Sequence, residues 1–143
     1  MFFEQPNLTD DALSAVGFVA PLTGNHALRF NVLEDEMLVE ISCEGVLLGA
    51  GGAARADLGF QVDALAATKL FASTIADGAF VPVSFKRVYR LARGEHVVTL
   101  LGEADAGAPA LNGTAYPTRM SVMQISNSNV LAANANAKRA GIY

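Results

Sequence analysis

The sequence holds few side chains that could act as a nucleophile or a base. It contains two histidines, His26 and His96, and one thiol, Cys43. A nucleophilic enzyme needs a Ser, Thr or Cys beside a base that a third group orients. His96 lies on an apolar strand face with Val98, and Cys43 lies on a similar face with Ile41. These positions favour a core or half-buried histidine and an inert packed thiol over a catalytic role.

Two groups of carboxylates could hold a cation or act as a hydrolytic pair. Glu34, Asp35 and Glu36 are adjacent, whereas an EF-hand loop spaces its ligands at alternate positions around a glycine, so the run favours a solvated turn. Glu103 and Asp105 could form a glycosidase-type pair. They lie in an expected loop, however, and the chain has no Trp to form a sugar platform. We predict no catalytic residue, no metal site and no cofactor.

A glycine-rich run and a basic cluster could each bind an anion. Neither Gly-Lys-Ser nor Gly-Lys-Thr closes the run at 49–52, and an alternating strand follows it where a phosphate-binding loop would open a helix. We therefore expect a structural bend there. The basic cluster places four cations within eight residues around Tyr89: Lys86, Arg87, Arg90 and Arg93. It favours a solvated strand face, with an anion-binding or subunit-contact patch as the alternative.

The composition indicates the class of protein to which these residues belong. With 143 residues, 52% of them hydrophobic and 17% charged, the chain fits one globular domain with its own core. The net charge of −4 opposes nucleic acid as the main partner. A single cysteine excludes a disulfide-stapled scaffold and fits a reducing compartment. No apolar run is long enough to span a bilayer, and the opening Met1–Glu4 lacks the basic segment of a secretion signal, so we expect a soluble chain with no membrane partner.

Hydrophobic periodicity predicts an all-β fold. At least five segments are expected to be strands: 37–44, 58–63, 81–91, 95–103 and 119–125. Alternation marks the first three, and 95–103 is apolar on both faces, which is typical of a central strand. Gly45 is expected to end the first strand, Ala115-Tyr116 to be extended, and residues 64–76 fit either a helical turn or a strand. Such a set predicts a β-sandwich or barrel. The predicted core includes Val39, Ile41, Phe60, Val62, Val83, Phe85, Val98 and Leu100.

The N-terminal segment predicts an arm that includes a short helix. The stretch Asn7–Val16 offers a hydroxyl cap, acids for the first turn and good helix formers, and Gly17 ends it. The following residues to Asn31 fit an irregular arm or a first strand. We therefore divide the chain into an N-terminal arm with a short helix (1–36), a β-sandwich domain (37–126) and an extended C-terminal arm (127–143).

The two ends of the chain are predicted to be attachment arms. Residues 1–57 hold nine acids and two bases, whereas residues 107–143 hold three bases and no acid. The segment from Ser126 onward alternates asparagines with small residues and cannot build a core, so we expect a partner to contribute to its ordering. The alternative is that the tail folds back on its own sandwich. The predicted contact residues are Phe2, Phe3, Asn127, Asn129, Asn134, Asn136, Lys138, Arg139, Ile142 and Tyr143.

One stretch carries a resemblance to a known group of proteins. Residues Val88–Leu100 combine a strand, an Arg-Gly turn and a His-hydrophobic-Thr-Leu strand, a pattern that resembles phage-encoded jelly-roll domains similar to the TNF and C1q sandwiches. Leu58–Asp63 is similar to the strand before this hairpin, and Arg119–Ile125 to the closing strand, so the resemblance covers 37–126. It implies a jelly-roll-like antiparallel β-sandwich that forms a homotrimer, and it gives His96 a fold position only.

The resemblance and the missing active-site chemistry favour a non-enzymatic virion protein. We expect a capsid decoration or cement protein that binds the major capsid protein on the outer surface of a phage head, after assembly in the host cytoplasm. Val97 and Leu101 give their strand a second apolar face, which also favours self-association. The alternative is a receptor-binding, carbohydrate-binding module of a tail or head fibre, although the chain has no shaft-like repeat. A lectin-like module would need exposed aromatic residues, and an enzyme is the last choice.

Overall fold

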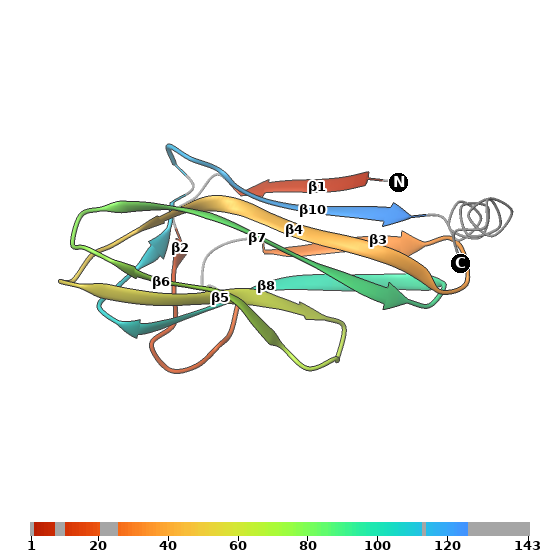
Figure 1. Cartoon of the computed structure of the whole chain (residues 1–143), viewed down its shortest axis with the longest axis horizontal. Helices are drawn as coiled ribbons and strands as arrows, with labels where there is room; N and C mark the ends of the chain where they lie inside the picture. Colours follow the sequence, from red (N-terminus) through yellow and green to blue (C-terminus); the bar gives the residue numbers. More distant parts are fainter. Residues whose placement is uncertain (1, 8–10, 21–25, 113, 126–143) are drawn as a thin grey trace, which may run out of the picture.

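The chain folds into two antiparallel β-sheets that face each other across one core (Figure 1). This computed structural model describes residues 2–7, 11–20, 26–112 and 114–125. Sheet A contains six strands: β1 (Phe2–Asn7), β2 (Asp11–Ala12), β4 (Met37–Leu48), β7 (Phe80–Leu91), β9 (Ala110–Leu111) and β10 (Thr118–Ile125). Sheet B contains four: β3 (Ala27–Val32), β5 (Ala54–Val62), β6 (Thr68–Ile75) and β8 (Gly94–Ala106). The described residues contain no helix, and therefore none that could cross a membrane.

Strand β4 is the centre of sheet A. It pairs with β7 along its whole length, from Met37 opposite Leu91 to Leu48 opposite Phe80. On its other side it pairs with β10, which in turn pairs with β1 at the edge. Sheet B has the order β3-β8-β5-β6. Four of the five predicted strand segments lie within a strand of this sandwich, and 58–63 lies within β5 except for Asp63, which follows it.

The predicted core is confirmed. All eight of its members are buried, and Val39, Ile41, Phe60, Val98 and Leu100 have no exposed surface. Phe60 from sheet B and Phe85 from sheet A meet across the core with ring centroids 4.9 Å apart. The alternation of side chains therefore assigned the inward faces of β4, β5, β7 and β8 correctly, because one face of each strand must leave water.

Three local predictions about strand limits are corrected or completed. The prediction that Gly45 ends the first strand is wrong, because β4 continues to Leu48. A Cβ on Gly45 would lie 2.9 Å from Thr118 Oγ1, so the glycine allows close approach of this side chain. The open segment 64–76 contains β6, which pairs with β5 around a bulge between Leu58 and Gly59. Ala115-Tyr116 forms a bend, where an extended pair was expected.

The described part of the N-terminal segment forms extended structure, not the expected short helix. Asp11 and Ala12 pair with β9, and residues 14 and 19 form single bridges with β8. Residues 8–10 lie outside the described residues. Leu13 is buried in the core, so an extended path that delivers its side chain there outweighs the local helix signal. Strands β1 and β3 also belong to the sheets, so the sandwich extends N-terminally beyond Met37.

Candidate functional site

The structure describes the backbone of two of the predicted contact residues. Phe2 pairs with Met123 and Phe3 pairs with Val122, both through β1 and β10. The other predicted contact residues lie outside the described residues: Asn127, Asn129, Asn134, Asn136, Lys138, Arg139, Ile142 and Tyr143.

Both terminal strands reach the same end of sheet A. Strand β1 starts at Phe2, beside Met123, and β10 runs antiparallel to it and stops two residues later at Ile125, beside Leu38 of β4. Figure 1 shows the start of β1 and the end of β10 at the same end of the sandwich. Phe2 and Phe3 are therefore part of the edge strand of sheet A. The start of β1 and the end of β10 lie close enough for one partner surface to contact both.

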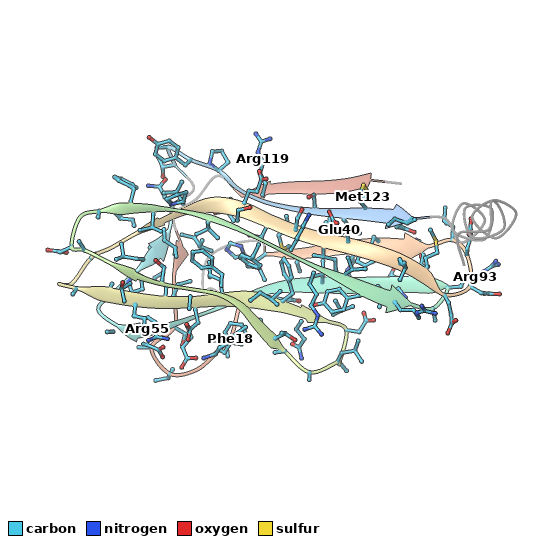
Figure 2. The ribbon with its side chains drawn as sticks, viewed as in Figure 1. Phe18, Glu40, Arg55, Arg93, Arg119 and Met123 are labelled. Atoms are coloured by element: carbon cyan, nitrogen blue, oxygen red, sulfur yellow. The ribbon has the colours of Figure 1, made fainter. Side chains whose placement is uncertain are left out.

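Apolar side chains gather on the outer face of sheet A at this end. Val88 is 50% exposed and Met123 is 42% exposed, and both lie opposite Glu40 in the strand register. Leu38 and Ile125 are register partners and are half-buried. Met123 and Glu40 are labelled on this face in Figure 2. We name Leu38, Val88, Met123 and Ile125 the terminal patch.

The middle of this outer face is polar. Ser42 and Ser121 join their hydroxyls by a hydrogen bond of 2.5 Å between β4 and β10. A shallow depression of about 400 Å³ lies between β4 and β7 and is lined by Glu40, Ser42, Glu44, Ser84, Phe85 and Lys86. Its carboxylates and hydroxyls can accept hydrogen bonds from a partner, and its ammonium can donate.

The far end of the outer face presents two aromatic rings. Phe80 is 52% exposed and Tyr116 is 53% exposed, and the rings meet edge to face with centroids 6.1 Å apart. The buried Asn112 side chain accepts hydrogen bonds from the amides of Ala115 and Tyr116, which holds the loop in place. The sequence analysis missed this pair, because the two residues are 36 positions apart (116 − 80) and only the register of β7, β4 and β9 brings them together.

The outer face of sheet B carries a network of opposite charges. Lys69 Nζ lies 3.0 Å from an oxygen of Asp57 and 2.7 Å from an oxygen of Glu103, and it also lies over the ring of Phe18. The hydrogen bonds to Glu103 and Asp57 raise the pKa of Lys69 above its usual value. Asp57 is only 5% exposed. Its buried charge is therefore compensated by a cation from the neighbouring strand.

The carboxylates predicted as a possible hydrolytic pair belong to this network. Oxygens of Asp57, Glu103 and Asp105 lie within 4.8 Å of one another, a spacing that a cation could bridge. Lys69 already lies between the first two, and Arg55 Nε lies 3.4 Å from Asp105. The arrangement is that of a salt-bridge network on a sheet, since each carboxylate has a protein cation as its partner.

The acidic run and the basic cluster of the sequence face each other. Strand β3 turns back at 33–36, which brings these acids beside the end of β7 and the turn after it. The resulting contacts join exposed side chains, so each contributes little to stability. They pair Arg90 with Glu36 and Arg93 with Asp35, while Lys86 lies 4.0 Å from Glu40 and Arg87 donates to Thr68 Oγ1. The basic cluster thus has intramolecular partners in place of a free anion-binding patch.

Cys43 and His96, the side chains that could be chemically reactive, both lie in environments that favour a structural role. Cys43 is buried, and burial together with the nearby charge of Glu44 raises the pKa of its thiol to about 12, which keeps it protonated. His96 is half-buried, as expected from its strand position, and both ring nitrogens are hydrogen-bonded. The ring of His96 is bonded to the Asp63 carboxylate and the Ala92 carbonyl, so among the described residues no hydroxyl or thiol is hydrogen-bonded to it.

Comparison with known proteins supports the fold and shows no family. No protein-family model matches the sequence, and no curated protein matches it. A chain in the structure of infectious bursal disease virus, Gx strain, superposes with a TM-score of 0.50 at 10% identity, over 90% of this chain. This chain spans about a third (34%) of the length of that viral chain. The likeness supports a jelly-roll-like β-sandwich.

Two other similar structures come from bacterial proteins. The CBM22-1 xylan-binding domain of Paenibacillus barcinonensis Xyn10C has a TM-score of 0.40 and 18% identity, covering 82% of this chain and 85% of the domain. Latent PorU of Porphyromonas gingivalis has a TM-score of 0.45 and 10% identity, covering 86% of this chain and 12% of that one.

Proposed function

We propose that this protein is a non-enzymatic structural component of a virus particle, a decoration or cement protein on the outside of a phage head. The observation that carries the proposal is the position of the two ends: β1 and β10 reach the same end of sheet A, beside the exposed terminal patch. A contiguous exposed apolar patch is typical of an interaction site. The β-sandwich shared with a viral chain is consistent with this role.

The C-terminal segment supports a contact with a partner. Ordering the residues from Ser126 to Tyr143 costs on the order of tens of kcal/mol in backbone entropy, at about 1–2 kcal/mol per residue. The segment has few bulky side chains to offset this cost by packing on its own sandwich. A neighbouring subunit can supply the missing apolar surface, and the terminal patch would extend the same contact onto the sandwich.

Sedimentation of particles tests the proposal. Particles from cells that express the gene are pelleted through sucrose, and an antibody detects the chain in the pellet. We expect the full chain to sediment with the particles, and a variant that lacks residues 126–143 to fold but stay in the supernatant. The matched control, Phe80→Ser at the far end of sheet A, should still sediment. A truncated chain that sediments as well as the full chain would contradict the arm contact.

Self-association as a homotrimer is the second part of the proposal. Leu101 is only 6% exposed and Val97 is half-buried, so their strand offers little open apolar surface. The trimer therefore rests on the resemblance of the hairpin at 88–100 to trimeric jelly-roll domains. Light scattering should give a mass near three chains, and a monomeric mass at high concentration would contradict the trimer.

A carbohydrate-binding role is the second candidate function. The exposed pair Phe80 and Tyr116 offers aromatic surface of the kind on which the apolar face of a sugar ring can pack. The polar depression between β4 and β7 lies on the same face of sheet A. On a glycan array, this role predicts binding that Phe80→Ala abolishes and Val88→Ala retains. No binding to any glycan would contradict it and leave the particle role intact.

A further inference from the structure

Both ring nitrogens of His96 are hydrogen-bonded to oxygen atoms. Its Nδ1 lies 2.6 Å from Oδ2 of Asp63, and its Nε2 lies 2.7 Å from the carbonyl oxygen of Ala92. The side chain is 13% exposed, and its ring lies near that of Phe30 on β3, with centroids 5.9 Å apart. Both distances are those of good hydrogen bonds.

These two contacts require a doubly protonated ring. A carbonyl oxygen can only accept, and so can an ionised carboxylate, whereas a neutral imidazole has a single N–H to donate. Burial of the ring disfavours the charged form, but the hydrogen bonds to Ala92 and Asp63 and the negative charge of Asp63 outweigh burial and raise the pKa of His96. Burial likewise disfavours the Asp63 carboxylate, and the bonds from His96 and the Val97 amide outweigh it and lower the pKa of Asp63.

The two acceptors belong to different connections of the sandwich. Asp63 follows β5 and opens the loop to β6, and Ala92 lies in the turn between β7 and β8. Asp63 is also fixed by the backbone, since its Oδ1 accepts the Val97 amide at 2.9 Å and its own amide donates to the Val97 carbonyl at 2.8 Å. The Ala92 carbonyl, by contrast, is tied to this cluster through the His96 ring.

We propose that His96 is a pH-sensitive latch that bonds the Ala92 carbonyl of the β7–β8 turn to the β5–β6 loop when its ring is doubly protonated and loses this bond when one ring proton leaves to solvent. The remaining proton stays on Nδ1, because a hydrogen bond to a carboxylate is stronger than one to a neutral carbonyl. Nε2 then presents a lone pair to the Ala92 oxygen, and two acceptors at this distance repel. The latch lies at the end of the sandwich where β10 stops, and it stands whether or not the protein binds a particle.

The other charged side chains around the latch have partners of their own. Arg29 of β3 pairs with Glu95 of β8 at 3.0 Å, on residues adjacent to Phe30 and His96. Arg93, next to Ala92 in the turn, pairs with Asp35 of the β3–β4 turn at 3.3 Å. Among the charged groups that the structure describes, Asp63 is therefore the one that bonds the His96 ring and favours its protonated form.

Solution NMR of the full chain tests the latch. Ring proton signals of both histidines are followed from pH 4.5 to 9, and the amide signals of Ala92, Arg93 and Val97 are followed in parallel. We expect His96 to titrate with a midpoint above 6.5, and the turn amides to shift with the same midpoint. The Val97 amide, which Asp63 holds, should move less.

Asp63→Asn is the decisive variant, because it keeps an acceptor of nearly the same shape and removes the charge. The midpoint of His96 should move to lower pH than in the unmodified chain, because the charge that favours its protonated form is gone. The latch is overturned if His96 titrates at or below 6.5, or if the turn amides do not follow its titration. Both outcomes can be read from the unmodified chain alone should the variant fail to fold.

Discussion

The two outer faces of the sandwich differ in how far the chain itself covers them. On sheet B, Phe18 approaches Gly59, Lys69 bridges Asp57 and Glu103, and Leu101 is only 6% exposed. On sheet A, Val88 and Met123 are open to solvent near the two chain ends. Figure 2 shows Phe18 and Arg55 on one side of the sandwich and Glu40, Arg119 and Met123 on the other.

The N-terminal segment produces this difference. After β2, residues 13–19 run beside the part of β8 that β3 does not reach. The Ser14 carbonyl accepts a hydrogen bond from the Ala104 amide, and Val19 exchanges two backbone hydrogen bonds with Gly102. Leu13 enters the core, and Phe18 reaches the outer face of sheet B. The segment covers part of sheet B, although its own Val16 and Val19 are exposed to solvent. We expect partners on sheet A because the terminal patch lies there beside β1 and β10.

The largest effect is expected where the covered face is tightest. A Cβ on Gly59 would lie 1.8 Å from the Thr68 carbonyl oxygen and 3.0 Å from the Phe18 ring, so Gly59→Ala must move backbone. We expect a loss of about 3 kcal/mol or more in the free energy of unfolding, the upper range for overpacking. Urea denaturation measures it. Ser84→Ala on sheet A, the matched control, should change stability by less than about 0.5 kcal/mol. Equal effects would show that the two faces do not differ.

Removing the bridging cation should come next in size. Lys69→Met leaves the buried Asp57 carboxylate without its partner on β6, and an uncompensated buried charge is destabilising. Lys86→Met on sheet A is the control, because Lys86 is exposed and lies 4.0 Å from a half-exposed Glu40. Thermal denaturation should show a clear loss for the first variant and almost none for the second. The reverse order would mean that the sheet B network does not stabilise the fold.

The latch predicts a smaller, pH-dependent effect on stability at the end of the sandwich where β10 stops. The raised pKa of His96 means that the folded chain holds this proton more tightly than the unfolded one. The stabilisation is therefore complete below the unfolded value of 6.5 and is lost as pH rises through the higher folded pKa. Melting temperatures should fall over that window, and His96→Gln should remove this part of the pH dependence. A melting temperature that rises there would contradict the assignment.

The alternation of apolar and polar side chains predicted most of the fold from the sequence. It placed the core residues of β4, β5, β7 and β8, because side chains alternate between the two faces of a strand as a local property of the chain. It misjudged Gly45 and the helix from Asn7, where a distant packing partner, Thr118 in one case and the core around Leu13 in the other, decides the local structure. Tertiary contacts outweigh local propensity at such points.

The sites were far less visible than the strands. The Asp57–Lys69–Glu103 network and the His96–Asp63 pair join residues that are 12 to 34 positions apart. Each exists because strand register places the partners side by side, and register is set by the whole sheet. The acidic run 34–36 and the basic residues of β7 were both identified, yet their mutual pairing required the β3–β4 turn and the end of β7 to lie together.

The smallest stability effect is expected on the open face, where it is also the most informative. Val88→Ser with Met123→Ser removes apolar side chains that the single chain leaves half exposed, so the free energy of unfolding should change by no more than about 0.5 kcal/mol per site. Sedimentation with particles should nevertheless be lost, because the terminal patch would no longer bury apolar surface against a partner. Phe80→Ser, with similar exposure at the far end of the same face, should leave sedimentation unchanged. A strongly destabilised double variant would mean that the patch is packed within the chain, and unchanged sedimentation would place the contact on another surface.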